Sequence, residues 1–203
     1  MGRTPGATAA GTSERLLRAA ADVFARRGYD GARVTDIAER AGLSNGALYA
    51  HFASKAELLL GALRAHGPRV LDSLIAASPT RSIADLLLET GRSLRRRRDP
   101  DGYLVLEALV AARRDEEVAG PMRDYVVDRT TWLAGLVREA QDRGELDAAL
   151  PPDAVAHFCL SLAVGTALVS PDLHDVDERD WAAFLGRLVA ALAPSPEQMG
   201  IAR

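Results

Sequence analysis

Residues Ala41 to Leu59 read AGLSNGALYAHFASKAELL, and this stretch decides how the chain is interpreted. It holds two glycines, a tyrosine, a histidine and Lys55, which is the only lysine among 25 basic residues. Gly42 separates two short segments of helical character, and residues 54–57, Ser-Lys-Ala-Glu, form a capping box that begins a further helix. The stretch therefore predicts short helices joined by tight turns.

Apolar residues recur with helical spacing on both sides of this stretch, and no alternating run of strand length lies between the turn signals. The sequence predicts an all-α fold of about nine helices without internal repeats. The expected helices span residues 13–27, 34–41, 43–52, 54–66, 83–98, 103–117, 122–143, 152–169 and 178–193.

Composition limits the class of protein. With 203 residues, of which 48% are hydrophobic, the chain can bury the core of one or two small domains, which excludes a disordered or fibrous protein. A single cysteine and four scattered histidines predict neither a disulfide nor a structural metal, and no cofactor is implied. Because residues 1–12 lack a signal sequence and the apolar segment 154–169 is shorter than the roughly 18 residues of a spanning helix, we expect a cytoplasmic protein without a membrane partner.

The net charge of −3 is unevenly distributed. Residues 1–58 contain eight basic and six acidic side chains, whereas the remainder contains 17 basic and 22 acidic side chains. A cationic N-terminal segment is typical of DNA-binding proteins, but an ordinary variation in surface charge explains this asymmetry equally well.

The two short helices joined by residues 42–44 predict a helix-turn-helix, in which the second helix enters the major groove of DNA. Leu43, Leu48 and Phe52 would anchor that helix, so its other side chains would face outward. Asn45 can pair with adenine through two hydrogen bonds, and the small residues Gly46 and Ala47 would let the helix approach the bases. Ser44, Tyr49, His51 and Lys55 are suited to phosphate oxygens.

The position of Lys55 also needs an explanation. A positive charge at a helix N-terminus opposes the helix dipole, so the sequence favours a bound anion over stability as the reason for Lys55. A helical hairpin that serves only packing remains an alternative of equal weight on the pattern alone.

Residues 13–60 resemble the DNA-binding domain of the TetR family of bacterial transcriptional regulators. The shared motifs are Ala20-x-x-x-Phe24, Gly28-Tyr29, Ile37-Ala38, Ala41-Gly42 and Gly46-x-Leu48-Tyr49-x-His51-Phe52-x-Ser54-Lys55. The resemblance implies base contacts at Asn45, Gly46 and Ala47, and phosphate contacts at Ser44, Tyr49, His51 and Lys55.

Two positions depart from the family pattern. Arg33 stands where the family often has a Thr or Ser that caps a helix and touches phosphate, and Thr35 follows two places on; both are candidate DNA contacts. Ala50 stands where the family often has an aromatic residue, so one backbone contact is missing.

The resemblance also implies the organisation of the rest of the chain. Between flexible tails at 1–12 and 195–203, the DNA-binding domain at 13–60 would precede a helical domain at 61–194 with a small-molecule pocket. The last two long helices would form a homodimer interface, and the sequence supports this with an apolar stripe. The expected interface residues are Phe158, Leu162, Trp181, Phe184, Leu185, Leu188 and Val189. Alternatively, the stripe covers the core of its own subunit.

The pocket is the least specified part of the prediction. Its candidate residues are Glu107, Tyr125, Arg129, Trp132, His157 and Thr166. Arg129 could pair with Glu107 or with an anionic ligand, but the sequence favours ordinary core or surface positions for all six residues.

Together these features predict a homodimeric, ligand-responsive repressor that an effector releases from a pseudo-palindromic DNA operator. An activator of the same family and a helical small-molecule-binding protein without an operator are the alternatives. An enzyme is disfavoured because the sequence contains no nucleophile motif, metal-binding motif or phosphate-binding glycine loop.

Overall fold

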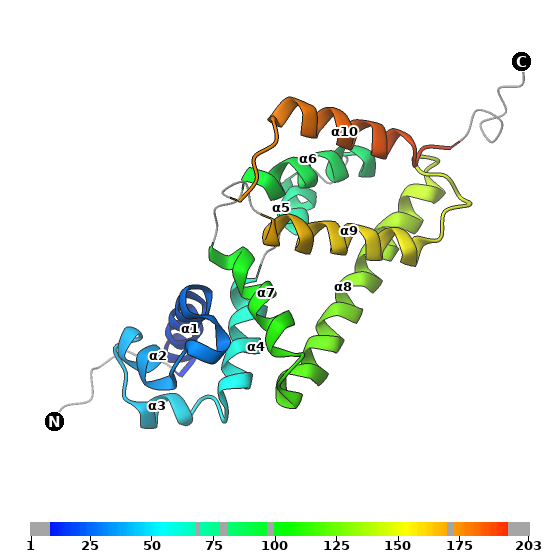
Figure 1. Ribbon diagram of the computed structural model, residues 1–203. Helices are drawn as coiled ribbons and strands as arrows, with labels where there is room; N and C mark the ends of the chain where they lie inside the picture. The colour runs from blue at the N-terminus through cyan, green and yellow to red at the C-terminus, as the bar shows by residue number, and fades with distance from the viewer. Residues whose placement is uncertain (1–8, 68–69, 78–80, 97–99, 170–172, 195–203) are drawn as a thin grey trace, which may run out of the picture. The chain divides into compact units, whose positions relative to one another are not determined.

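The computed structural model describes residues 9–67, 70–77, 81–96, 100–169 and 173–194, so most of the two predicted tails lies outside the described residues (Figure 1). Residues 9–12, which were expected in the flexible N-terminal tail, are helical. Every regular element in these ranges is an α-helix, which confirms the all-α prediction. The helices are α1 (Ala9–Gly31), α2 (Val34–Arg40), α3 (Asn45–Tyr49), α4 (Lys55–His66), α5 (Val70–Ala77), α6 (Ile83–Arg96), α7 (Pro100–Ala111), α8 (Glu116–Asp142), α9 (Pro152–Leu168) and α10 (Glu178–Ala190). Within the described ranges, no helix is long and apolar enough to span a bilayer, and no cluster of side chains could hold a metal ion.

The helices form two compact units. Unit 1 contains α1 to α4, α7 and the part of α8 up to Asp124. Unit 2 contains α5, α6, the part of α8 from Tyr125 onward, α9 and α10. The sequence placed α7 in the second domain, but in the structure α7 packs against α1 and α4.

Glycines with positive φ end the first two helical segments at the predicted places. Gly28 has φ 70° and interrupts the helical geometry of α1, and Gly42 has φ 65° directly after α2. At Gly42 the amide of Leu43 donates to the carbonyl of Ala38, which is the six-residue hydrogen bond of a Schellman motif. The tight connection into α3 therefore depends on the backbone freedom of Gly42.

The predicted capping box at the start of α4 is present, with one change. The Oγ of Ser54 accepts a hydrogen bond of 3.1 Å from the amide of Glu57, as expected. The Glu57 carboxylate reaches back to the amide of Ala53, at 2.6 Å, whereas the usual motif uses the amide of the capping residue itself. Ser54 and Glu57 together set the start of the helix that follows α3.

The start of α8 was predicted incorrectly. The expected helices 103–117 and 122–143 leave a break that contains Gly120 and Pro121, but both residues lie inside α8. The helix begins earlier because Asp115 accepts a hydrogen bond of 2.9 Å from the amide of Glu117 and so caps its N-terminus. Pro121 lies close to the N-terminus of α8 and lacks a backbone N–H, so it removes only one intrahelical hydrogen bond.

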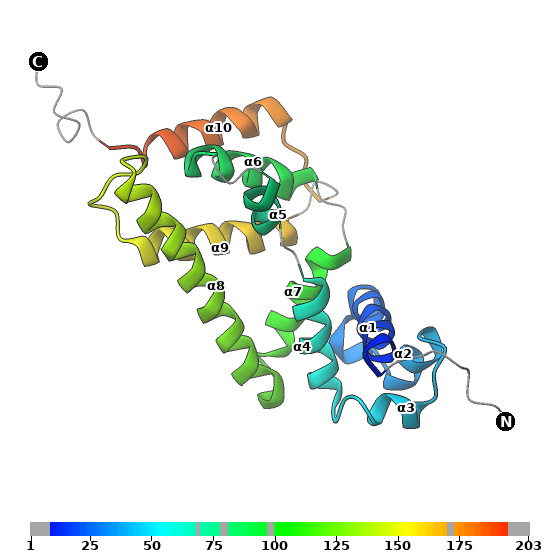
Figure 2. The same cartoon turned by 180° about the vertical axis from the view of Figure 1, so that it is seen from behind.

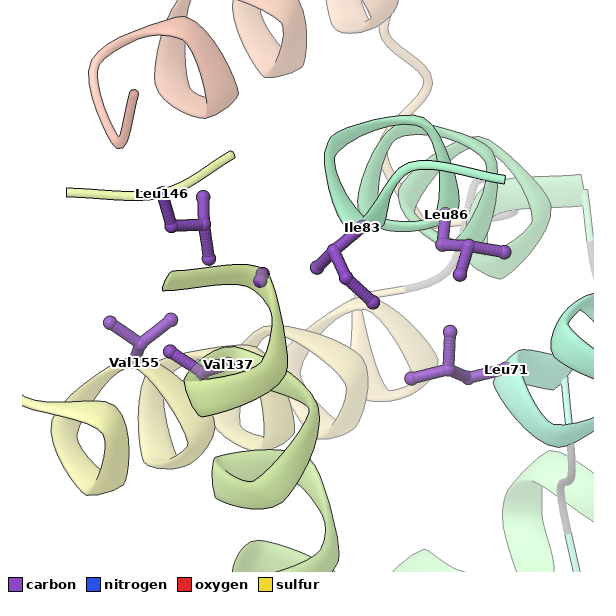
Figure 3. Packing of buried hydrophobic residues seen from close by; sticks show 7 residues of the cluster. Leu71, Ile83, Leu86, Val137, Leu146 and Val155 are labelled. Carbon is purple, nitrogen blue, oxygen red and sulfur yellow. The ribbon is translucent and has the colours of Figure 1, made fainter. Parts of the chain in front are cut away.

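The core of unit 2 forms where α5, α6, α8 and α9 meet. Six large members of the buried cluster converge in Figure 3: Leu71, Ile83, Leu86, Val137, Leu146 and Val155. Helix α10 runs alongside α6, as both whole-molecule views show (Figures 1 and 2). Helix α5 was not predicted from the sequence, since its eight residues are fewer than the window in which helical periodicity is measurable.

Candidate nucleic-acid interface

Helix α3 presents the outward face that the sequence predicts. Leu48 is buried in unit 1, whereas Asn45 and Gly46 are exposed and Tyr49 keeps 56% of its surface accessible. An aromatic side chain this exposed contributes little to the packing of its own domain. Ser44 precedes the helix as its N-cap, and its Oγ accepts a hydrogen bond of 3.2 Å from the amide of Ala47.

Three further candidate phosphate contacts lie beside α3 in the sequence. Arg33 is the N-cap residue of α2, but its side chain makes no capping bond, which agrees with the loss of the family's Thr or Ser at this position. Arg33 and Thr35 are exposed, and His51 is half-buried with its ring 6.5 Å from that of Phe52. Within the described residues, Arg33 forms no ion pair.

Most other arginines of the helix-turn-helix region are held by groups of unit 1. Arg27 pairs with Asp36, and Arg40 pairs with Asp22. Arg15 donates a hydrogen bond to the carbonyl of Ala41 at the end of α2. The positive charge available to a ligand near α3 is therefore smaller than the count of basic residues suggests.

Lys55 has a structural partner that the sequence did not predict. Its Nζ donates a hydrogen bond of 2.8 Å to the carbonyl of Tyr29 and lies 3.4 Å from the carbonyl of Ala32. These carbonyls lie at the end of α1, where a helix carries partial negative charge. The inference that stability does not explain Lys55 was therefore wrong, because its partners lie more than twenty residues away in the sequence.

Glu107 and Arg129, whose pairing the sequence left open, each have a different partner. Glu107 belongs to unit 1, where its Oε2 accepts a hydrogen bond of 3.0 Å from the amide of Tyr29. In unit 2, Arg129 donates to both carboxylate oxygens of Asp72, at 2.6 and 3.2 Å, and its guanidinium lies 4.4 Å from the centre of the Trp132 ring. Asp72 is on α5, so missing that helix meant missing the partner of Arg129.

A small apolar cavity of about 20 Å³ lies in unit 2. Its lining residues are Leu71, Ile83, Leu86, Leu87, Leu133, Leu136, Val137, Ala156 and Cys159. Burial raises the pKa of the Cys159 thiol above its ordinary value, so the thiol stays protonated at neutral pH.

None of the six predicted ligand residues is among the residues that line this cavity. His157 is exposed, while Tyr125 and Trp132 are half-buried. The Thr166 hydroxyl donates to the carbonyl of Leu162, at 2.8 Å, within its own helix. The predicted ligand residues are polar or aromatic, whereas the cavity is lined mostly by aliphatic side chains.

Two residues of the predicted dimer stripe pack within their own subunit. Leu185 is only 4% exposed and lies so close to Gly91 of α6 that a Cβ at residue 91 would stand 2.7 Å from Leu185 Cδ1. The Trp181 Nε1 donates a hydrogen bond of 3.1 Å to the carbonyl of Gly91. Trp181 and Leu185 therefore hold α10 on α6, as the alternative reading of the stripe expected.

The other predicted interface residues are at least partly accessible. Phe158 on α9 is 53% exposed, and Phe184 on α10 is 54% exposed. Leu162, Leu188 and Val189 are half-buried. The two exposed phenylalanines lie on the consecutive helices α9 and α10 and leave apolar surface that a partner could cover.

Comparison with known protein families settles the class of protein. Residues 16–62 match the model described as bacterial regulatory proteins, tetR family, and residues 77–190 match the tetracyclin repressor-like C-terminal domain. The chain belongs to the TetR family of bacterial transcriptional regulators. The first match covers α2, α3 and most of α1 and α4, so the exposed face of α3 lies in the part of the chain that carries the TetR helix-turn-helix.

Individual relatives are HTH-type transcriptional regulators, which agrees with this assignment. The transcriptional regulator UidR of Escherichia coli K12 is 26% identical over 171 residues, which are 84% of each chain. The uncharacterized regulator YfiR of Bacillus subtilis is 31% identical over 158 residues, or 74% of this chain and 75% of YfiR. The solved structure of Salmonella enterica GusR superposes with a TM-score of 0.76 at 23% identity, covering 90% of this chain and 95% of GusR, which shows a common fold.

Proposed function

We propose that this TetR-family regulator binds a pseudo-palindromic operator as a homodimer and that a small molecule releases it from DNA. In this arrangement the α3 helices of the two subunits enter successive major grooves about 34 Å apart. The observation that carries the proposal is the exposed face of α3, where Asn45, Gly46 and Tyr49 are exposed while Leu48 anchors the helix from behind.

The residues at the start of α3 are assigned to base recognition. Asn45 is the first residue of the helix, and the N-terminal end of a recognition helix is the part that reaches base edges. Its amide can donate to and accept from adenine, which discriminates against other bases by about 1–3 kcal/mol. Gly46 and Ala47 add little bulk, so the backbone of α3 can approach the groove floor.

The surrounding polar residues are assigned to the DNA backbone. Arg33, Thr35 and Tyr49 are exposed and can reach phosphate oxygens directly. Ser44 uses an oxygen lone pair for its capping bond but keeps its hydroxyl proton for a phosphate, and His51 offers a ring nitrogen. Lys55 already holds the end of α1, and the ammonium group retains a third proton for a phosphate.

The dimer contact is assigned to the exposed parts of α9 and α10. Phe158 and Phe184 would form its centre, with Leu162, Leu188 and Val189 completing the apolar surface. A two-fold contact of this kind buries the same patch on both subunits. Trp181 and Leu185 support the contact indirectly by fixing α10 on α6.

The effector is assigned to the apolar cavity of unit 2. A volume of about 20 Å³ is little more than one water molecule needs, and an aliphatic lining offers water few hydrogen bonds. A ligand larger than a water molecule must therefore displace lining side chains, among which Leu133 and Leu136 belong to α8. Such a ligand shifts the protein between states only by the difference in its affinity for them.

Operator binding by the purified full-length protein tests this function. DNA from directly upstream of its own gene is compared with a scrambled duplex at several stated salt concentrations, followed by selection from a random library. Arg33→Ala should weaken binding to all DNA sequences. It should also reduce the slope of log affinity against log salt concentration by about 1, which corresponds to one lost phosphate contact. Arg123→Ala, an exposed arginine on α8, is the matched control and should change neither.

The proposal fails if neither genomic nor selected DNA binds better than scrambled sequence. That result would favour the alternative of a helical small-molecule-binding protein without an operator. Transcription from a reporter promoter that carries the operator then separates a repressor from an activator.

A further inference from the structure

The polar groups of Tyr29 are all engaged by distant parts of unit 1. Its phenol O–H donates a hydrogen bond of 2.7 Å to Oδ2 of Asp115, and its amide N–H donates to Oε2 of Glu107. Its carbonyl accepts from Nζ of Lys55, which also lies 4.3 Å from the centre of the Tyr29 ring. One residue at the end of α1 thus contacts α7, the start of α8 and the start of α4.

This cluster, defined as Tyr29, Lys55, Glu107 and Asp115, is largely shielded from water at its centre. Tyr29 is only 7% exposed, and its ring lies 6.0 Å from that of buried Phe24. In such surroundings a satisfied polar network is rigid, whereas a missing partner leaves a buried polar group unpaired. Small displacements of its members are therefore unfavourable.

The backbone at Gly28 is fitted to the same cluster. Gly28 has φ 70°, and a Cβ at this position would stand 3.0 Å from Oε2 of Glu107. Glycine thus allows the chain to turn and also leaves room for the carboxylate that holds the Tyr29 amide.

Asp115 connects the cluster to α8. While its Oδ2 accepts from Tyr29, its Oδ1 accepts from the amide of Glu117 and caps α8. One carboxylate therefore fixes the position of α1 and the first turn of α8. Helix α8 continues without interruption to Asp142, and its later residues Leu133, Leu136 and Val137 line the cavity.

Lys55 connects the same cluster to the DNA-facing helix. It is the first residue of α4 and follows the end of α3 at Tyr49 by six positions. Holding Lys55 on the Tyr29 carbonyl therefore fixes one end of the short segment between α3 and α4.

We propose that Tyr29, Glu107 and Asp115 are positioning residues for DNA binding, which couple the start of α8 to the orientation of α3 without touching DNA. This inference rests on the proposed function, because it requires operator binding. When α8 shifts, the Asp115 carboxylate moves with its first turn, and the hydrogen bond to Tyr29 either restrains α8 or breaks. The helix-turn-helix loses its fixed support when this bond is broken.

Tyr29→Phe tests the proposal, because it removes the hydroxyl and keeps the ring. We expect operator affinity to fall about fivefold to tenfold, within the range of ordinary coupling between sites. The slope of affinity against salt and the preferred bases should stay unchanged, since no phosphate or base contact is lost. Tyr103→Phe removes the hydroxyl of an exposed tyrosine in α7 and should leave affinity unchanged.

A pair of Glu107 variants separates positioning from general stability. Glu107→Gln keeps an oxygen that can accept from the Tyr29 amide, so it should retain most of the affinity that Glu107→Leu loses. Measurements are made well below the unfolding temperature of each variant, so that a loss of folded protein does not mimic weaker binding.

Hydrogen exchange provides a reciprocal readout in the wild-type protein. If the intact hydrogen bonds of the cluster increase operator affinity, bound operator DNA must stabilise those hydrogen bonds by the same factor. The amides of Tyr29 and Glu117 should therefore exchange about fivefold to tenfold more slowly when the operator is bound.

Three results would overturn the proposal. The first is unchanged operator affinity in Tyr29→Phe together with a lower unfolding temperature, which indicates a purely structural role. The second is a changed salt slope, which indicates direct DNA contact, and the third is unaltered exchange at both amides. If the wild-type protein binds no DNA specifically, both the proposed function and this inference fail. If the wild-type protein binds DNA specifically but the variants and the hydrogen exchange show none of the expected effects, only this inference fails.

Discussion

The ammonium group of Lys55 contacts Tyr29 twice. It lies 2.8 Å from the backbone carbonyl oxygen of Tyr29 and 4.3 Å from the centre of the Tyr29 ring. A side chain at the start of one helix thus stabilises the end of another. The sequence motif that suggests a DNA contact at Lys55 therefore also encodes an intramolecular contact.

Replacing Lys55 by methionine should lower the free energy of unfolding by about 1–2 kcal/mol, because a charged hydrogen bond and a cation–π contact are lost. Chemical denaturation in the absence of DNA measures this effect. Arg123→Met, at an exposed position on α8, should change stability by less than about 0.5 kcal/mol. Equal stability of Lys55→Met and wild type would contradict the structural role of Lys55.

Stability should fall at high pH because of Tyr29. Burial, and next the hydrogen bond to Asp115, raise the pKa of Tyr29 well above its ordinary value of 10. The unfolded chain therefore releases this proton near pH 10 while the folded protein keeps it. The stabilisation is complete below pH 10 and declines above it, by at most about 1.4 kcal/mol per pH unit, until the pH reaches the pKa of the folded state.

Denaturation of wild type and Tyr29→Phe between pH 8 and 11 measures this contribution. The variant cannot ionise at this position, so its stability should decline less steeply above pH 10. Parallel curves for the two proteins would show that the Tyr29 hydroxyl ionises equally well in the folded and unfolded states.

Two glycine substitutions should act in opposite directions. Gly28→Ala forces a Cβ into a positive-φ position and against Glu107, so it should destabilise the protein by about 1–2 kcal/mol. Gly135 lies inside α8, and a Cβ there meets no atom within 4 Å, so Gly135→Ala should stabilise the protein by about 0.5–1 kcal/mol. Thermal unfolding compares the two, and equal shifts in the same direction would contradict the conformations described for these residues.

Phe184→Asp should dissociate the homodimer, because a charge would be placed within the proposed apolar contact. Sedimentation equilibrium of the variant should give the monomer mass while wild type gives the dimer mass. Val127→Asp is the matched control, since Val127 is 53% exposed on α8 and lies outside the proposed contact. Dimers of unchanged affinity in Phe184→Asp would place the interface elsewhere.

Local sequence signals predicted much of this fold. Gly28 and Gly42 mark turns because only positive φ fits there, and Ser54 with Glu57 marks a helix start because both act within a few residues. The alternation of buried Leu48 with exposed Asn45 and Tyr49 also follows from helical periodicity. These features depend on neighbouring residues, so a single sequence contains the information.

The errors concern partners that are distant in the sequence. Lys55 binds Tyr29, Arg129 binds Asp72 and Leu185 packs on Gly91, and none of these pairs follows from local pattern. The cavity was missed for the same reason, because its aliphatic lining comes from four helices and resembles any other core.

The most direct test of sequence-specific DNA recognition by α3 is a quantitative measurement of binding to the selected operator. Wild type, Asn45→Ala and Lys55→Ala are compared across a series of salt concentrations. Asn45→Ala should reduce the preference for operator over scrambled DNA by about 1–3 kcal/mol and leave the salt slope unchanged. Lys55→Ala should weaken binding to both duplexes alike. If wild type and Asn45→Ala show the same preference for the operator, α3 does not read bases through Asn45.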